Sequence, residues 1–182
     1  MLDINFKIFP VLETGRLVLR KADLNDANEM YAMRSDAKVM QYIPRPLSTD
    51  VSEAVDYINS LEERMVAKEC INWAITLKEN GEMIGTIGFY RMKLEHYRAE
   101  AGYMLLPTYH GKGYVAEALN RIVKFGFSEM GLHSIEALID PDNIGSMKVL
   151  EKCGFVKEAH FKENEFYDGK FLDTLVYSRL EK

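Results

Sequence analysis

The sequence predicts a single domain of the mixed α/β (α+β) class, in which a mostly antiparallel sheet is flanked by helices. Its 182 residues are the length of one domain, and shares of 47% hydrophobic and 28% charged residues are those of a soluble globular protein. Apolar residues recur with the period of a strand in several segments and with that of a helix in others. Because no repeat, low-complexity tract or linker interrupts the chain, one domain is expected over residues 1–182.

The first third of the chain is predicted to hold one strand and two helices. "RLVLR" alternates charged and apolar residues, as a half-buried strand does, while two prolines in "IPRPL" exclude regular structure there. Asp50 followed by Glu53 resembles a capping arrangement and precedes an apolar stripe at helical spacing. The predicted order is strand 16–20, helix 23–33, loop 43–47 and helix 51–65.

The remaining chain is predicted to form an antiparallel meander followed by alternating strands and helices. Asn80-Gly81 is a strong hairpin signal between two apolar runs, and Pro107 ends the third run. Gly154 stands at the stop position of a helix, and Asp168-Gly169 marks a turn between the last two strands. The elements are strands 71–77, 83–92 and 98–106, helix 112–129, strand 134–139, helix 144–153, and strands 155–161 and 171–180.

Composition limits the classes of partner. Twenty-three basic and 28 acidic residues give a net charge of −5, which argues against a nucleic-acid surface and suits an amine-bearing ligand. No segment is long and apolar enough for a membrane helix, and the N-terminus is unlike a secretory signal, so we expect a cytoplasmic protein. Cys70 and Cys153 are far apart and lack metal-ligand neighbours, so no metal is expected. A homodimer is compatible with the sequence, which does not determine the oligomeric state.

The stretch "LLPTYHGKGYVAEAL" (105–119) places two glycines at the mouth of a helix, and several interpretations compete for it. The ATP-type P-loop fails, because its spacing requires glycine where Leu106 stands and Ser or Thr where Gly113 stands. The dinucleotide fingerprint matches as Gly111, Gly113 and Ala116, but the preceding hairpin fits no doubly wound nucleotide-binding half. A plain strand-to-helix turn is a further possibility. The last interpretation is a diphosphate cradle made of free backbone N–H groups at a helix N-terminus.

A second motif, "DNIGSMKVLEKCGF" (142–155), decides between these interpretations. Asn143 alone is explained as a helix N-cap, but that does not explain its pairing with a glycine turn 30 residues upstream. Together the two stretches resemble the GNAT superfamily of acetyl-CoA-dependent N-acetyltransferases. "ETGRLVLRKADLNDA" (13–27) and "YDGKFLDTLVYSRL" (167–180) extend the resemblance to the branch of the RimJ/RimL-like ribosomal-protein N-terminal acetyltransferases. Three positions depart from the superfamily pattern: His110, Val115 and Leu150, the last where many members carry a tyrosine acid.

The resemblance implies a splayed pair of central strands, with acetyl-CoA held between the strand ending at Leu106 and strand 134–139. Asn143 is then expected at the pantetheine or thioester region, and the glycine turn at the diphosphate. The residues expected to bind acetyl-CoA are Met104, Leu105, Leu106, His110, Gly111, Lys112, Gly113, Tyr114, Val115, Ala116, Asn143 and Ser146.

The resemblance also implies catalytic roles. Glu165 matches the glutamate proposed as base in the RimJ/RimL-like branch, and Ser146 matches the serine proposed as acid. Glu100 on the central strand is the second candidate for the base, with a structural salt bridge as its alternative explanation. The loop "YIPRPLSTD" (42–50) and residues 162–169 are expected to shape the acceptor pocket.

The expected reaction is acetyl transfer from acetyl-CoA to a primary amine, a protein N-terminal α-amino group being favoured. A polyamine, antibiotic or toxin amine is the first alternative, and a non-catalytic CoA-binding module is the second. A nicotinamide oxidoreductase is disfavoured.

Overall fold

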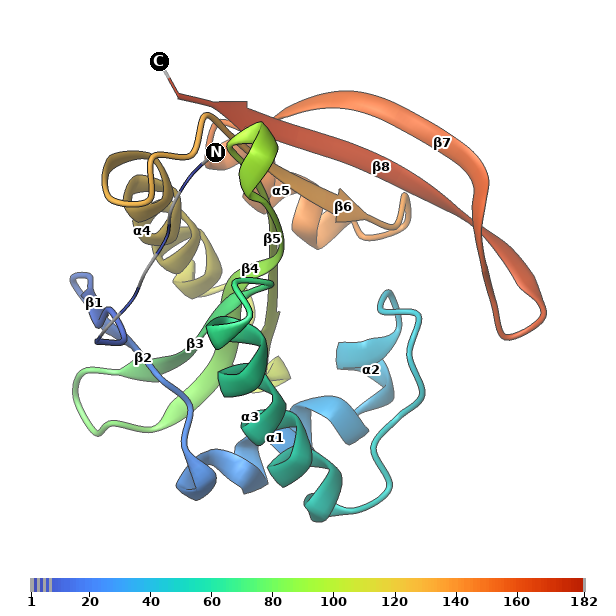
Figure 1. Ribbon diagram of the computed structural model, residues 1–182. Helices are drawn as coiled ribbons and strands as arrows, with labels where there is room; N and C mark the ends of the chain where they lie inside the picture. Colours follow the sequence, from blue (N-terminus) through green and yellow to red (C-terminus); the bar gives the residue numbers. More distant parts are fainter. Residues whose placement is uncertain (1, 3, 5, 7, 182) are drawn as a thin grey trace.

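The computed structural model describes residues 2, 4, 6 and 8–181. One strongly twisted sheet of eight strands runs through the molecule in the order β1-β2-β3-β4-β5-β6-β8-β7 (Figure 1). All neighbouring strands are antiparallel except β5 and β6, which are parallel. The strands are β1 (Leu12–Glu13), β2 (Leu17–Arg20), β3 (Ile71–Leu77), β4 (Met83–Lys93), β5 (Arg98–Leu105), β6 (Ser134–Ile139), β7 (Val156–Tyr167) and β8 (Lys170–Leu180).

Helices cover both faces of this sheet, which confirms the predicted fold class. One hydrophobic cluster lies between the sheet and α4 and α5, and a second lies between the sheet and α1, α2 and α3. Residues of β3 are therefore buried on both faces. The helices are α1 (Ala27–Ser35), α2 (Ala37–Met40), α3 (Val51–Val66), α4 (Tyr114–Ser128) and α5 (Ile144–Lys152), with 3-10 turns η1 (Leu24–Asp26), η2 (Leu94–His96) and η3 (Pro107–Tyr109).

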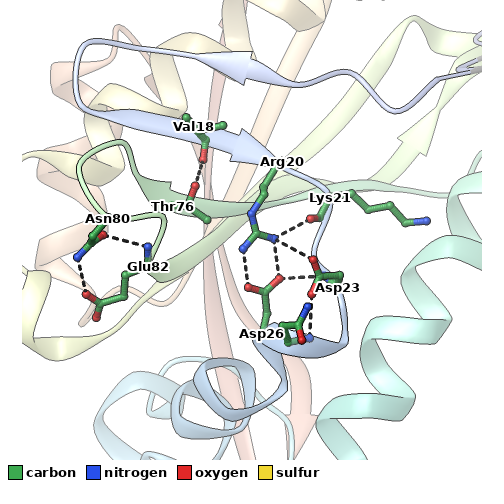
Figure 2. A network of polar contacts seen from close by, with 9 residues as sticks. Val18, Arg20, Lys21, Asp23, Asp26, Thr76, Asn80 and Glu82 are labelled. Atoms are coloured by element: carbon green, nitrogen blue, oxygen red, sulfur yellow. Dashed lines mark hydrogen bonds and ion pairs between the residues drawn. The ribbon is translucent and has the colours of Figure 1, made fainter.

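Polar contacts fix the start of the first helical segment (Figure 2). The predicted helix at Asp23 begins as the 3-10 turn η1 and becomes α-helical at Ala27. Asp23 caps this turn, and the buried carboxylate of Asp26 accepts two 2.7 Å hydrogen bonds from the Arg20 guanidinium. Such a bidentate pair is geometrically specific, so it sets the direction in which α1 leaves the sheet.

The last hairpin differs from the prediction, which ended its first strand at residue 161. β7 continues to Tyr167, with an irregularity in register between Phe161 and Glu165. Glu163 adopts a φ of 51°, and its N–H donates to the Asp173 carboxylate at 2.9 Å. A bulge of this kind interrupts the alternation of side chains. The sequence of residues 162–167 therefore lacks the pattern of a strand, although this segment belongs to β7.

The central parallel strands separate, as the resemblance implied. β5 and β6 pair only from Arg98 to Glu100 on β5; β5 then continues along β4, while β6 continues along β8. The register of β4 against β5 shifts between Phe89 and Arg91, opposite the residue where the separation begins. Because a bulge bends a strand and increases its twist, we attribute the separation to this irregularity around Tyr90.

Both cysteines belong to the core. Cys70 and Cys153 are buried and unpaired, and burial raises the pKa of both thiols. Among the described residues, no group of three or more His, Cys, Asp or Glu side chains could hold a metal ion. No helix in that part of the chain is long and apolar enough to cross a membrane.

Candidate active site

Beyond the paired residues of β5, one edge of this strand faces a gap. The N–H of Leu106 donates to the carbonyl of Ile84 on the β4 side at 2.9 Å. Hydrogen bonding alternates along an antiparallel strand, so the backbone groups of Met104 also face β4. Those of Tyr103 and Leu105 face the gap. An extended ligand that pairs with this edge therefore meets Tyr103 and Leu105, whereas the Leu106 N–H is already engaged.

The glycine turn presents a row of backbone donors at the start of α4. Gly111 and Gly113 have φ values of 73° and 80°, and Gly113 is the N-cap residue of the helix. No backbone N–H of residues 111–116 donates to an acceptor in the described part of the chain. A Cβ at Gly111 would meet no atom within 4 Å, so the approach to these donors is open. Positive helix-end potential and unclaimed donors together form an anion site.

The side chains around this turn leave the donors accessible. Val115 is partly buried against the main core, and Ala116 is buried in it. The His110 ring lies 2.9 Å from the Leu105 carbonyl, so it covers one backbone group on the open edge of β5. The Lys112 ammonium lies 5.1 Å from the centre of the Tyr109 ring, at the rim of the turn.

Arg16 and Glu117 fasten the turn to the N-terminal strands, a role that the sequence analysis did not assign. The Glu117 carboxylate accepts hydrogen bonds from the Thr14 hydroxyl at 2.6 Å, from the Arg16 N–H at 2.9 Å and from the Arg16 guanidinium at 2.7 Å. The same guanidinium donates to the Lys112 carbonyl at 3.0 Å and lies over the Tyr114 ring. The stretch "ETGRL" contains Thr14 and Arg16, but it lies about a hundred residues before the turn in the sequence. Local patterns therefore could not predict this contact.

Asn143 and Ser146 at the start of α5, together with Tyr103 of β5, are polar residues beside the gap. The Asn143 side-chain oxygen accepts from the Ser146 N–H at 3.0 Å, so Asn143 is an N-cap whose amide NH₂ remains available to a ligand. Burial raises the pKa of Tyr103 on β5 to about 12, and the Ser146 side chain opposes this shift. The Tyr103 hydroxyl is buried without a hydrogen bond to the described residues. Leu150 is completely buried in the core, so it is a packing residue.

A cleft of about 640 Å³ joins these groups to the helical side of the molecule. Both segments expected to shape an acceptor pocket contribute to its wall, with residues 42–45 from one and residues 164–165 from the other. Glu100, Glu165, Asn143 and Ser146 all line the same cleft. The structure thus brings together the predicted catalytic residues, which come from β5, β7 and α5.

The two candidate bases differ in their surroundings. Glu100 lies at the point of strand separation with its side chain 19% exposed, 3.1 Å from the Arg91 guanidinium. Burial raises the pKa of Glu100 above its ordinary value, although Arg91 opposes the shift. Glu165 is exposed on β7, opposite Leu172 of β8. A carboxylate with a raised pKa in a cleft is a candidate for proton transfer.

Residues 16–156 match the acetyltransferase (GNAT) domain family. The chain belongs to this family. The chain is 35% identical over 171 residues to the uncharacterized N-acetyltransferase YoaA of Bacillus subtilis, and the alignment covers 94% of this chain and 97% of the relative. A spermidine N(1)-acetyltransferase of Vibrio cholerae is 23% identical and covers 88% of this chain and 90% of its own.

Solved structures share the GNAT fold over nearly the whole chain. An acetyltransferase of the GNAT family from Bacillus anthracis superposes with a TM-score of 0.84 at 32% identity, covering 94% of this chain and 98% of its own. RimL, a ribosomal L7/L12 α-N-protein acetyltransferase solved with coenzyme A, superposes with a TM-score of 0.85 at 19% identity over 94% and 98% of the two chains. The latter likeness concerns the fold alone. The GNAT protein is thus an acetyl-CoA-dependent N-acetyltransferase, and the disfavoured oxidoreductase interpretation is excluded.

Proposed function

We propose that this GNAT protein acetylates the α-amino group of a protein or peptide N-terminus at the gap between β5 and β6. The observation that carries acetyl transfer at this gap is that Glu100, the candidate base, and Tyr103, next to the candidate acid Ser146, lie on opposite faces of the sheet. Successive residues of a strand alternate between faces, so Glu100 shares the α1–α3 face with Met104, whereas Tyr103 shares the α4–α5 face. An amine arriving on one face and a thiol leaving on the other require this arrangement.

The residues present fit acetyl-CoA, which supplies an acetyl group activated as a thioester. The unclaimed N–H groups of residues 111–116 are suited to the diphosphate, and the open space at Gly111 leaves room for it. The backbone of Tyr103 and Leu105 is suited to the amide groups of the pantetheine arm. The free amide NH₂ of Asn143 is a donor for a carbonyl oxygen near the gap.

Glu100 is the proposed base, although the family resemblance favoured Glu165. An α-amino group with a pKa of about 8 is roughly a tenth neutral at pH 7, so one weak carboxylate base suffices to accept its proton. The raised pKa of Glu100 brings it closer to the working pH, where a general base is most effective. Glu165, on the wall of the same cleft, is the competing candidate.

Ser146 is the proposed proton donor to the departing sulfur. Ser146 stands at the start of α5 and lines the cleft, and its side chain opposes the raised pKa of Tyr103. A thiol with a pKa near 8.5 is a good leaving group, so this proton transfer needs only a weak donor. Tyr103 retains its proton near neutral pH and can donate a hydrogen bond to the Ser146 oxygen.

Acetylation of a peptide panel tests the proposed acceptor class. The protein is incubated with acetyl-CoA and peptides that have free N-termini, and with spermidine, the amine named for a relative. Mass spectrometry is expected to place the acetyl group on the α-amine. Acetylation of spermidine alone would transfer the assignment to a polyamine, and a thermal shift with NAD but none with acetyl-CoA would contradict the proposed use of the gap.

A further inference from the structure

The wall of the cleft that faces the sheet from α1 and α3 carries positive charge. We call it the arginine wall and define it by Arg34 of α1, Arg45 of the following loop and Arg64 of α3, all of which line the cleft. The carboxylates that line the cleft come from the strand side instead, and they are Glu100, Asp140, Glu165 and Asp173. Figure 1 shows these two sides, with α1–α3 and their loop across from β6 and the β7–β8 hairpin.

The arginine wall is held together around Tyr57. The Arg34 guanidinium stacks on the Tyr57 ring at 4.2 Å, and Arg64 donates to the Tyr90 carbonyl at 3.1 Å. Burial raises the pKa of the Tyr57 hydroxyl strongly, while Arg34, Arg64 and Arg45 all act on it in the opposite direction, which places all three charges near one point. The loop that bears Arg45 is tied back to α1 because the Ser48 N–H donates to the Arg34 carbonyl at 3.0 Å.

Two of these cations lack an acidic partner in the described part of the chain. Arg64 lies 3.4 Å from Glu69, but Arg34 and Arg45 form no ion pair there. The Nε–H of Arg34 is also buried without a hydrogen-bond acceptor. A buried N–H of a charged group is almost always satisfied, and a ligand oxygen that reaches Arg34 would supply the missing acceptor.

The diphosphate of acetyl-CoA is not that ligand. None of residues 107–116, which carry the glycine turn, lines this cleft. The arginine wall lies instead on the α1–α3 face, where Glu100 is proposed to meet the amine. Its oxyanion therefore belongs to the acceptor.

We infer that the acceptor of this enzyme is an anionic amine, whose carboxylate or phosphate binds Arg34 and Arg45 while its amino group lies at Glu100. This inference rests on the proposed function and narrows its substrate class. Guanidinium groups recognise both oxyanions through paired N–H donors. At this wall they repel a polyamine, which is cationic along its whole length, so we expect spermidine to be a poorer substrate than an anionic amine.

Matched amines that differ only in the anion test the inference. Acetylation is measured with two pairs, Ala-Glu amide against Ala-Gln amide and O-phosphoserine amide against serine amide, and with spermidine. We expect kcat/KM for the anionic member to exceed that of its neutral partner by roughly 10- to 100-fold, the effect of one charged hydrogen bond. The pair with the larger ratio identifies carboxylate or phosphate as the natural group. Equal values within both pairs, or a preference for spermidine, would overturn the inference.

Variants connect any preference to the arginine wall. R34M keeps the length that stacks on Tyr57 but removes the charge, and it should lower kcat/KM for the anionic member of each pair far more than for the neutral member, so that the preference is lost. K38M removes an exposed cation of α2 that does not line the cleft, and it should behave as wild type. R34K, for use if R34M unfolds, retains the charge without the Nε donor and should lose part of the preference. Identical selectivity in R34M and K38M would contradict the inference.

The inference and the proposed function fail in different ways. If calorimetry detects no acetyl-CoA binding and no amine is acetylated, the proposed function fails. If neutral α-amines are acetylated as fast as anionic ones, the proposed function stands and the inference fails. If acetyl-CoA binds but calorimetry in the presence of CoA detects neither Ala-Glu amide nor O-phosphoserine amide, the arginine wall does not bind a free oxyanion, and the inference also fails.

Discussion

Replacement of Gly113 by valine separates the backbone requirement of the glycine turn from its proposed role in binding acetyl-CoA. Gly113 adopts a φ of 80°, which costs an L-residue about 1–2 kcal/mol and a β-branched residue more. Inside the protein the new Cβ would lie 3.6 Å from the Arg16 guanidinium, an ordinary contact, so no further clash adds to this cost. For a chain of this length we expect the melting temperature to fall by roughly 2–8 °C.

G113V should lose more affinity for acetyl-CoA than the backbone strain at residue 113 accounts for. The valine side chain would stand among the donors of residues 111–116 and displace the diphosphate from at least one of them. A hydrogen bond to a charged group contributes about 1.5–3 kcal/mol, so acetyl-CoA should bind roughly 10- to 150-fold more weakly. Isothermal calorimetry on the folded variant measures this value directly.

Gly169 supplies a matched control in the turn between β7 and β8. Its φ is 77°, and a Cβ there would meet nothing within 4 Å, so G169V carries the same backbone strain far from the start of α4 in sequence. We expect G169V to lose similar stability and to retain wild-type affinity for acetyl-CoA. If G113V is folded and binds acetyl-CoA as tightly as G169V does, the diphosphate does not lie at this turn, and the reasoning is refuted.

Three further predictions concern the carboxylates and the acid. E100Q should lower turnover about 10²–10⁴-fold at neutral pH, with a smaller loss at high pH and unchanged acetyl-CoA affinity. If pH–rate profiles instead show a large loss for E165Q and nearly wild-type turnover for E100Q, Glu165 is the base. S146A should lower kcat more than it changes KM for acetyl-CoA, and equal kinetics to wild type would remove the serine from the mechanism. Burial alone would raise the pKa of Glu117, but hydrogen bonds from Thr14 and Arg16 outweigh it and lower this pKa. The folded state therefore binds fewer protons than the unfolded state, so Glu117 stabilises the fold above its unfolded pKa, and this contribution is lost as the pH falls through the folded value. E117Q should thus unfold more easily than wild type at about pH 7 and converge with it in acid; parallel unfolding curves at all pH values would contradict this.

Local features of the sequence determined most of the secondary structure and the conformation of the glycine turn. Asn80-Gly81, Pro107 and Gly154 are signals that act within a few residues, and the structure has the expected strand or helix ends beside them. The glycines at 111 and 113 were read as a donor-rich turn for the same reason, because positive φ is a property of the residue itself. Such local signals can be recognised in the sequence without knowledge of the tertiary structure.

The structure alone decided where the separated strands part and what surrounds the gap. The irregularity at Tyr90 depends on the register between β4 and β5, and the long β7 depends on a bulge whose N–H finds Asp173 across the hairpin. Neither register nor bulge has a local signature, because each is set by pairing with a distant segment.

The same limit applies to the electrostatics of the cleft. Arg64 and Tyr57 lie about two turns apart on α3, and only the packing of α1 against α3 brings Arg34 to the same tyrosine. The sequence suggests a salt bridge for Glu100, and the structure has one with Arg91. The burial that raises the pKa of Glu100, however, depends on the surrounding elements. The sequence by itself therefore determined the family and predicted the glycine turn as the place for acetyl-CoA, because the chemistry of that turn lies in the backbone of contiguous residues. Only the tertiary structure supports the proposals on the base and on the acceptor pocket, because charges and burial there come from segments that meet only in the folded chain.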